Sequence, residues 1–530
     1  PPRLQQISWV VVEVLFLILT ATIAYYGWGQ IERLQEYPQH TTALRIPFLI
    51  PYLILPFGFG LMCFRLLQSL YKQAKVCGLV DTLIGLVAVF VIASPVIFCE
   101  YIEPLPALFG YFIVMCAIGV PVAISLGLST LATIICADTL PIEYMAQVAF
   151  TSIDSFPIMA IPFFIAAGEY MGAGGLSKRL LNLADEIVGG LYGGIGLTAV
   201  VTCMFFGAIS GSGPATTAAV GSMCIPLLTS VGYDLTFATA LVAVSGSLGI
   251  IIPPSIPYIM YCNASGASIS ELFLAGFLPG VLIALCLMVY SYIYCKIHGE
   301  DKDKLNAKCM ELRAKGLGTV LKEGFWALMS PVIILGGIYG GICSPTEAAT
   351  ISIFYSLIVS LFIYRTIKIR DLPKIMLEGI HSYAPILIIL SAAVAFARVI
   401  TLMNVATIVS EAVLSAISSK VVILLLINVL LLFVGMIMDT GPAILVFTPV
   451  LLPVAEAIGV DPIHFGIIMC VNLAIGFVTP PMGANLFVAS NLSKVSVFDI
   501  ARKAVPFILA FLIALLLITF VPQISMFLLQ

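Results

Sequence analysis

Long apolar runs dominate this sequence and restrict the chain to folds that are stable in a lipid bilayer. Of the 530 residues, 61% are hydrophobic and 10% are charged, whereas soluble domains carry about 25% charged residues. Runs long enough to cross a bilayer, about 17–25 residues, occur at 7–28, 45–69, 78–99, 104–136, 272–295, 326–343, 349–364, 384–403, 420–438 and 504–528. Because only helices and closed barrels satisfy their backbone groups in lipid, and continuous runs favour helices, the sequence predicts an all-α polytopic membrane protein.

The composition argues against several classes of function. The formal net charge is −3 and no long basic tract is present, so we expect no nucleic-acid partner. The 13 cysteines are scattered through apolar runs without a CxxC pair, and the four histidines form no HExxH motif, so we expect neither a zinc site nor a disulfide framework. No GxxxxGK[ST] motif is present, so energy for uphill work must come from an ion gradient or another subunit. We expect no cofactor.

One polar stretch divides the apolar sequence. Residues 296–323 carry seven Lys and Arg residues and no apolar run, which predicts a cytoplasmic loop by the positive-inside rule. The loop separates a middle part, about 104–295, from a last part, about 324–530, and both follow a first part of about 100 residues. The chain opens with Pro-Pro-Arg instead of Met, and we expect that residues upstream are missing from it.

The middle and last parts carry the same pattern twice. Gly213-Pro214 corresponds to Gly441-Pro442 at an offset of 228 residues, and Pro253-Pro254 corresponds to Pro480-Pro481 at an offset of 227. The surrounding motifs also align, "LGIIIPPSIPYIMYCNAS" with "IGFVTPPMGANLFVAS". Chance matching of Gly and Pro in apolar sequence is the alternative, but a nearly constant offset over more than 100 residues favours an internal duplication.

Each Pro-Pro pair interrupts an apolar run and therefore breaks a predicted helix. Proline donates no backbone hydrogen bond and disfavours helix at the residue before it. Irregular backbone at membrane depth is tolerated where it lines a cavity, and matched interruptions in two halves are typical of the binding site of a secondary transporter. The alternative is a proline kink that serves packing alone. The sequence therefore favours a coupling-ion site at the two breaks.

The two Gly-Pro turns carry oxygen-bearing side chains suited to a hard monovalent cation. The first turn is "GAISGSGPATT", with Ser210, Ser212, Thr216 and Thr217, and the second is "GMIMDTGPA", with Asp439 and Thr440. Sodium favours oxygen ligands as other hard cations do, and the scarcity of carboxylates argues against a divalent ion. The alternative for each hydroxyl is a bond to its own helix backbone.

One cation stands inside an apolar run of the last part. Arg398 in "AAVAFARVITL" is a candidate partner for an anionic substrate. Its alternative roles are an internal salt bridge or a side chain that reaches from a helix end to the membrane interface.

The motifs "GSGPATTAAVGSMCIPLL" and "GFVTPPMGANLFVAS", with "SPTEAA" between them, resemble the large membrane subunit of the tripartite ATP-independent periplasmic (TRAP) transporters. The resemblance covers 104–530. Residues 1–76 resemble the C-terminal half of the family's small membrane subunit, and 77–103 would be the connecting helix of a fused version. The whole chain is most similar to the fused sialic-acid permeases of the family.

The resemblance implies an inverted-repeat, elevator-type transporter with two re-entrant hairpins and two broken helices, in which scaffold helices come from the small subunit. It implies a multi-pass protein of the bacterial inner membrane that takes an acidic sugar, sialic acid (N-acetylneuraminate), from a periplasmic binding protein and couples its import to sodium, with no ATPase subunit. The implied sodium site 1 comprises Ser210, Ser212, Gly213, Gly249, Ile252 and Pro254. The implied sodium site 2 comprises Asp439, Thr440, Gly441, Gly476, Thr479 and Met482. By the resemblance, substrate would lie near Ser210, Ser212, Asp439 and Thr440, and we add Arg398 to this predicted substrate site because it stands in an apolar run.

Other functions remain open at this point. The same transporter class could carry another carboxylate, such as a C4-dicarboxylate, or the chain could be a channel or scaffold subunit driven by another protein. A membrane-embedded enzyme is a third alternative, but no Ser or Cys has a catalytic base near it in sequence, so we expect a protein that is not an enzyme.

Overall fold

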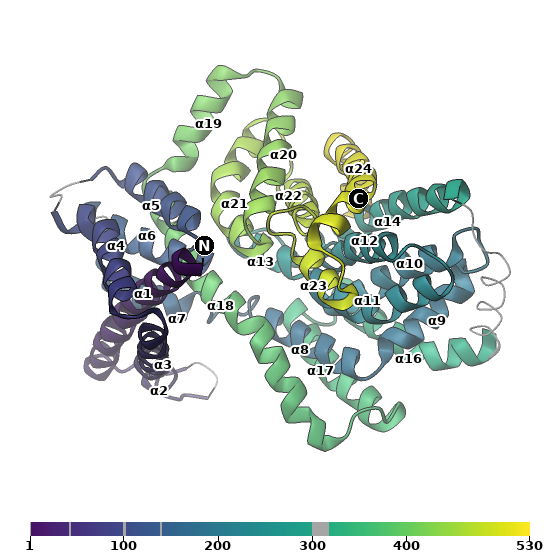
Figure 1. The fold of residues 1–530 in the computed structure, drawn as a ribbon, viewed down its shortest axis with the longest axis horizontal. Helices are drawn as coiled ribbons and strands as arrows, with labels where there is room; N and C mark the ends of the chain where they lie inside the picture. Colours follow the sequence, from purple (N-terminus) through teal and green to yellow (C-terminus); the bar gives the residue numbers. More distant parts are fainter. Residues whose placement is uncertain (1, 42–43, 99–101, 138–139, 299–316, 530) are drawn as a thin grey trace. The chain divides into compact units, whose positions relative to one another are not determined.

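The computed structural model describes residues 2–41, 44–98, 102–137, 140–298 and 317–529, and within these ranges the chain is almost entirely helical (Figure 1). No β-strand occurs among the described residues, which confirms the predicted all-α fold. The helices divide into two compact units, Pro1–Ser155 with Pro385–Val409, and Phe156–Ala384 with Ser410–Gln530. We call them unit 1 and unit 2.

Unit 1 contains the first seven helices and half of a later one. They are α1 (Pro2–Glu36), α2 (Leu49–Tyr52), α3 (Ile54–Cys77), α4 (Leu79–Phe98), α5 (Pro104–Ile118), α6 (Val122–Ala137), α7 (Glu143–Thr151) and the second half of α18 (Leu372–Leu402). Aromatic contacts hold several of these helices together. The rings of Tyr52 and Phe150 stack with centroids 3.9 Å apart, and Phe396 of α18 packs against Phe109 and Phe112 of α5.

Unit 2 contains both copies of the duplicated pattern. The first copy includes α8 (Ala160–Ala173), α9 (Leu176–Val188), α10 (Gly194–Ser210), α11 (Gly213–Ser230), α12 (Leu235–Gly246), η1 (Ser247–Ile250), α13 (Ile256–Ser265) and α14 (Ile269–His298). The second includes α16 (Leu317–Tyr339), α17 (Pro345–Ile358), η2 (Val359–Ile363), η3 (Ile369–Asp371), the first half of α18, α20 (Lys420–Ile437), α21 (Thr440–Ala457), α22 (Pro462–Gly476), α23 (Ala484–Ser493), α24 (Val497–Phe520), α25 (Gln523–Met526) and η4 (Phe527–Leu529). Helix α19 (Val405–Ala416) connects α18 to α20.

Ten helical segments of the described chain are long and apolar enough to cross a membrane, and they correct the predicted runs in two places. The run 104–136 is two helices, because Gly119 takes a left-handed conformation (φ +90°) that ends α5, and Pro121 precedes α6. The additional segment is α21, where Pro449 and Pro453 stay inside a helix that is largely buried among its neighbours. Prolines are tolerated in membrane helices where neighbouring groups satisfy the freed backbone.

The predicted cytoplasmic loop is shorter than expected at both ends. Helix α14 extends to His298 and α16 begins at Leu317, so the residues of 296–323 at either end are helical. The rest of this prediction, 299–316, lies outside the described residues.

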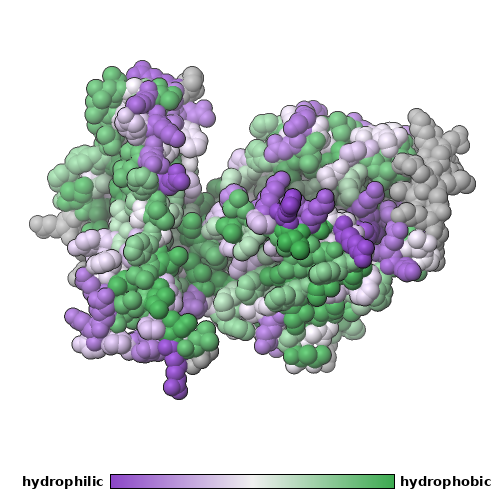
Figure 2. Space-filling model, turned by 90° about the horizontal axis from the view of Figure 1, so that it is seen from below, coloured by the Kyte–Doolittle hydropathy of each residue, from purple (hydrophilic) through white to green (hydrophobic). Residues whose placement is uncertain are grey.

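Large apolar side chains cover much of the protein surface, as lipid contact requires. On the face shown in Figure 2, hydrophobic residues form broad continuous areas between smaller hydrophilic groups. The exposed apolar side chains of the described chain include Phe64 on α3 and Phe433 on α20, which are 56% and 59% exposed. In water, an exposed apolar surface of this extent would drive aggregation.

Candidate functional site

The two Gly-Pro turns are the tips of two helical hairpins in unit 2. Helices α10 and α11 are separated only by residues 211–212, and α20 and α21 only by 438–439. Ser212 caps α11, because its side chain accepts a hydrogen bond from the backbone of Ala215, and Asp439 caps α21 by accepting one from the backbone of Thr440 at 2.7 Å. Short polar residues of this kind are preferred at helix N-termini.

The first Pro-Pro pair lies in a break between two helices, as predicted. Helix α12 tightens into the 3₁₀ turn η1, ends at Ile250, and resumes as α13 at Ile256. The hydroxyl of Ser255 donates to the carbonyl of Ile250 across the break, at 2.5 Å. The Pro253–Pro254 bond is cis, and Ile256 donates its backbone N–H to the carbonyl of Gly211 in the first tip at 3.4 Å.

The second break repeats this arrangement. Helix α22 ends at Gly476, α23 begins at Ala484, and the Pro480–Pro481 bond is again cis. The Thr479 hydroxyl donates to the carbonyl of Gly476 at 3.2 Å. Met482 donates its backbone N–H to the carbonyl of Met436, one turn before the second tip, at 3.1 Å. Each break is therefore hydrogen-bonded to the hairpin of its own repeat.

A pair of glycines allows each hairpin to approach its break at backbone distance. A Cβ atom on Gly207 of α10 would lie 2.8 Å from the Cα of Gly249, and a Cβ atom on Gly476 would lie 2.7 Å from the Cα of Gly435 on α20. Gly207 and Gly435 differ by 228 residues, and Gly249 and Gly476 by 227, so the two pairs are equivalent positions of the duplication. No larger residue fits at Gly207 or Gly476 without moving backbone, because the atoms nearest to these two positions all belong to the main chain.

The first tip also meets the second break. A Cβ atom on Gly213 would lie 3.1 Å from the ring of Phe477 and 3.2 Å from the Oδ1 atom of Asn485. Asn485 stands at the start of α23, and its amide nitrogen donates to the carbonyl of Ala243 at 3.1 Å and to the hydroxyl of Ser247 at 3.2 Å. One side chain of the second repeat thus bonds to the broken helix of the first.

The second tip in turn meets the first broken helix. A Cβ atom on Gly441 would lie 3.1 Å from the sulfur of Met260, which belongs to α13. Because each tip contacts its own break and an element next to the other break, both tips and both breaks gather in one region of unit 2. This region is the candidate functional site.

The structure brings together twelve of the thirteen different residues that the sequence predicted for the ion and substrate sites. They are Ser210, Ser212, Gly213, Gly249, Ile252, Pro254, Asp439, Thr440, Gly441, Gly476, Thr479 and Met482, all on the tips and breaks of unit 2. Ser210 and Ile252 are buried, whereas Asp439 and Met482 reach the surface. Arg398, the remaining residue, is exposed on the part of α18 that belongs to unit 1, and its role in substrate binding stays a prediction.

Several of the hydroxyls bond to their own tip, which was the alternative for these residues. The Thr216 hydroxyl donates to the carbonyl of Ser212 at 2.7 Å and lies 2.8 Å from the hydroxyl of Ser210. This bonding fixes the shape of the tip. Because these hydroxyls are already hydrogen-bonded, the oxygens left to bind a cation are mainly backbone carbonyls, together with the few side-chain oxygens described next.

Buried oxygens without a hydrogen-bond partner lie beside the first tip. Within the described part of the chain, these include the hydroxyls of Thr217 and Ser245 and the Oδ1 atom of Asn485. A Cβ atom on Gly246 would touch the Thr217 hydroxyl and would lie 3.3 Å from the carbonyl oxygen of Gly213. A buried polar atom without a partner costs free energy unless a ligand or water satisfies it.

Sequence reasoning missed three contributors to this site. Gly207 and Gly435 carry a signal, since they occupy equivalent positions of the duplication, but the need for a glycine there becomes visible only when the helices cross. Asn485 lies within the recognised motif "GFVTPPMGANLFVAS", yet the pattern does not indicate that its side chain reaches the other repeat.

Comparison with known proteins assigns both parts of the chain to one kind of transporter. Residues 109–524 match the family described as "Tripartite ATP-independent periplasmic transporter, DctM component". Residues 1–76 match "Tripartite ATP-independent periplasmic transporters, DctQ component". Both components therefore occur in a single chain.

Three relatives illustrate the range of substrates carried by similar proteins. The isethionate TRAP transporter permease protein DctMQ of Oleidesulfovibrio alaskensis is 50% identical over 530 residues, 99% of this chain and 82% of that protein. The C4-dicarboxylate large permease DctM of Rhodobacter capsulatus is 37% identical, covering 79% of this chain and 97% of the relative. The sialic acid large permease SiaM of Vibrio cholerae is 33% identical, covering 80% and 97% respectively.

Solved structures with a similar fold are also membrane transporters. The Alcanivorax borkumensis YdaH transporter aligns with a TM-score of 0.54 at 15% identity, covering 78% of this chain and 98% of that one. The Neisseria gonorrhoeae efflux pump MtrF aligns with a TM-score of 0.52 at 15% identity, covering 70% and 82%. At this identity the likeness concerns the fold alone.

Proposed function

The chain belongs to the tripartite ATP-independent periplasmic (TRAP) transporter family, and from that premise we propose that it is the permease of a sodium-coupled importer for a small organic anion. It is a multi-pass protein of the inner membrane. The observation that carries the proposal is the repeated contact of Gly207 with Gly249 and of Gly435 with Gly476. Two equivalent places where a hairpin tip meets a broken helix suit two equivalent cation sites.

Backbone oxygens at the breaks are the proposed principal ligands for sodium. Among the described residues, no group of three or more His, Cys, Asp and Glu side chains is placed to hold a metal ion, so the available donors are carbonyls, hydroxyls, amides and the single carboxylate of Asp439. Hard cations accept such oxygens readily. The unpartnered oxygens of Thr217 and Asn485 support a cation beside the first tip, and we add both residues to the predicted site 1.

Isethionate is the first substrate to test, and sialic acid the second. The relative named for isethionate is 50% identical over nearly the whole chain, whereas the relative named for sialic acid is 33% identical over the large component. The likeness thus gives less support to sialic acid than to isethionate. A sulfonate and a carboxylate both place a compact anion between the tips, near Ser210, Ser212, Asp439 and Thr440, where α11 and α21 begin. Helix N-termini favour negative charge.

Two sodium ions entering with one monovalent anion would carry net positive charge into the cell. Each elementary charge crossing 100 mV is worth about 2.3 kcal/mol. We therefore propose electrogenic uptake, driven by both the sodium gradient and an inside-negative potential. We also propose that a periplasmic binding protein delivers the substrate and that the elements of unit 2 move it across the membrane in an elevator motion.

Uptake into proteoliposomes tests the proposal. The reconstituted chain, together with its cognate binding protein and labelled isethionate, should accumulate substrate under an inward sodium gradient without ATP. Choline in place of sodium should abolish accumulation, and an inside-negative potassium diffusion potential should increase it. Accumulation that continues in choline would overturn the coupling, and uptake of labelled sialic acid in preference to isethionate would overturn the substrate assignment alone.

A further inference from the structure

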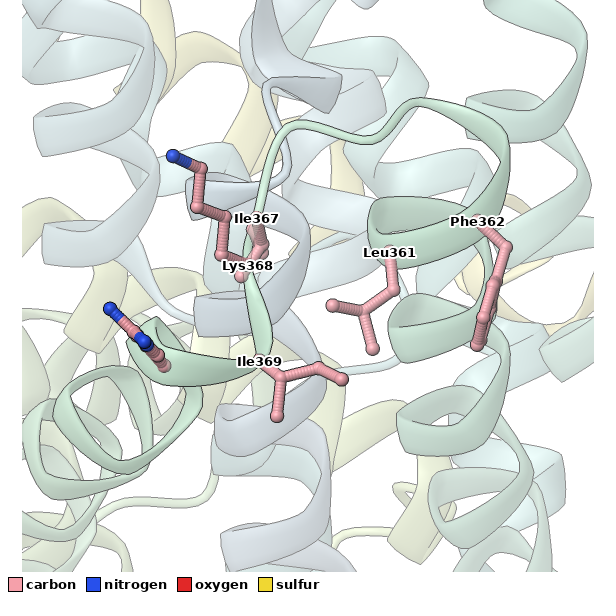
Figure 3. Close-up of a pocket in the computed structure, with 6 residues that line it drawn as sticks. Leu361, Phe362, Ile367, Lys368 and Ile369 are labelled. Atoms are coloured by element: carbon pink, nitrogen blue, oxygen red, sulfur yellow. The ribbon is translucent and has the colours of Figure 1, made fainter.

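An open pocket lies after the end of α17, and no residue of the tips or breaks lines it. It has a volume of about 420 Å³ and is lined by Leu361, Phe362, Ile367, Lys368, Ile369 and Arg370 (Figure 3). Its volume falls within the range of about 300–1,000 Å³ that is common for small-molecule sites. The π-helical turn η2 forms one wall, and irregular turns of this kind occur often at functional sites.

The pocket has an apolar part and a cationic part. In Figure 3, Leu361 and Ile369 extend toward each other, whereas the ammonium group of Lys368 points away from both. Phe362 and Ile369 are 68% and 75% exposed, so the described residues leave both apolar side chains largely uncovered. Arg370 also lines the pocket and carries a second cation.

Among the described residues, no carboxylate forms an ion pair with the side-chain cations at this end. In the part of the chain that the structure describes, neither the side-chain ammonium of Lys368 nor the guanidinium of Arg370 forms an ion pair within 4.0 Å of a carboxylate. Asp371 is near in sequence, and one of its oxygens accepts a hydrogen bond from the backbone of Lys368 at 3.0 Å. Lys374 pairs with Glu378 at 4.0 Å. Arg365 adds a further exposed cation, so the segment 365–378 carries net positive charge.

The position of the pocket along the membrane normal follows from the helix order. Tyr364 donates its hydroxyl hydrogen to the carbonyl of Glu323 at 2.5 Å, and Tyr355 does the same to Trp326 at 2.6 Å. The end of η2 therefore lies beside the first turns of α16, which follows residues 299–316 with their five Lys and Arg residues in sequence. By the positive-inside rule this end faces the cytoplasm, where anionic lipids attract basic groups.

We propose that the pocket binds an anionic phospholipid, with an acyl chain between Leu361, Phe362 and Ile369 and the phosphate at Lys368 and Arg370. The apolar wall favours a ligand with a hydrocarbon part over a purely polar one. The cations of Lys368 and Arg370 favour an anionic headgroup over a zwitterionic one. A bound lipid would tie the 364–371 connection, and so the junction of α17 with α18, to the membrane surface.

Native mass spectrometry of the purified full chain tests this proposal with phosphatidylglycerol as the probe. The double variant K368Q/R370Q should bind phosphatidylglycerol about tenfold more weakly, which corresponds to about 1.4 kcal/mol, and phosphatidylcholine with unchanged affinity. The matched control K72Q/K75Q removes two exposed cations at the end of α3 and should leave binding unchanged. Equal losses in the two double variants would overturn the site in favour of a general effect of net charge.

Two further experiments distinguish binding of the whole lipid from binding of its phosphate headgroup alone. Filling the apolar part with L361W should weaken phosphatidylglycerol binding without changing any charge. Glycerol phosphate alone should fail to compete at concentrations that saturate the lipid. Competition by glycerol phosphate, or full lipid binding by L361W, would show a simple phosphate site and overturn the proposal.

Discussion

Replacing Gly249 by alanine tests whether the approach of the first tip to the first break is required for function. A Cβ atom at this position would contact the Thr216 hydroxyl and would lie 2.6 Å from the carbonyl oxygen of Ser212 and 3.0 Å from the Cβ of Thr216. Carbon atoms on real side chains do not approach backbone oxygens this closely, so the tip must move away from the break. Overpacking of a buried site costs about 1–3 kcal/mol.

The same displacement predicts the size of the effect on sodium binding. We expect sodium to bind only when the first tip lies against the first break. Restoring that contact in G249A costs about 1–3 kcal/mol, which weakens the sodium affinity by roughly 5- to 140-fold at about 1.4 kcal/mol per tenfold. The assay is thermal unfolding of the purified variant during a titration with sodium chloride against choline chloride. We expect the stabilisation by sodium to shift to higher concentration, and sodium-driven uptake in proteoliposomes to fall in parallel.

Two control variants separate this effect from general destabilisation. G336A introduces the same methyl group on α16, where a Cβ atom meets nothing within 4 Å, and should not alter sodium binding. I250V removes a methyl group from a buried residue at the break, which should cost about 0.5–1.5 kcal/mol of stability. It adds no atom between the first tip and the first break, so the tip need not move. The reasoning is refuted if G249A binds sodium and transports as G336A does, or if I250V shifts the sodium titration as far as G249A.

Three related variants probe the rest of the site. G476A should impair sodium-driven uptake at least as strongly as G249A, because its Cβ would lie 2.5 Å from a backbone carbonyl carbon of α20, which yields less easily than a side chain. T216V should lower the unfolding free energy by about 0.5–1.5 kcal/mol, since it removes the bond between the Thr216 and Ser210 hydroxyls and leaves Ser210 only its longer bonds to the backbone of Ser212; T216S should restore it in the same denaturation assay. N485A removes the bond to Ala243 and an unpartnered oxygen beside the first tip, and should raise the sodium concentration for half-maximal uptake more than it lowers thermal stability.

The sequence predicted the breaks and tips well because proline and glycine act locally. The pairs Pro253-Pro254 and Pro480-Pro481 each remove two backbone donors in succession, and the duplication shows this break twice. The split of the run 104–136 at Gly119 was missed, since one glycine in apolar sequence is compatible with a continuous helix. The length of α21 was missed for the opposite reason, because prolines that end a soluble helix remain inside this buried one.

The crosswise contacts could not be predicted, because they depend on how the two repeats are packed. Gly213 lies against Phe477 and Asn485 of the other repeat, and Gly441 lies against Met260, at sequence separations of more than 180 residues. A duplicated sequence specifies the same unit twice, but it does not state which surfaces of the two units meet. Nor does it show which hydroxyls are consumed by local bonds, as those of Ser210 and Thr216 are.

These crosswise contacts have a consequence for coupling between the two proposed ion sites. Asn485 belongs to the second broken helix, bonds to the carbonyl of Ala243 in the first, and places its other amide atom beside the first tip. A cation that draws in the first tip therefore acts on α23 as well as on α12. Interactions between residues that share one hydrogen-bond network are not additive. The double variant G249A/N485A should consequently lose less sodium affinity than the sum of the single losses, and additive losses would show that the two repeats bind their ions independently.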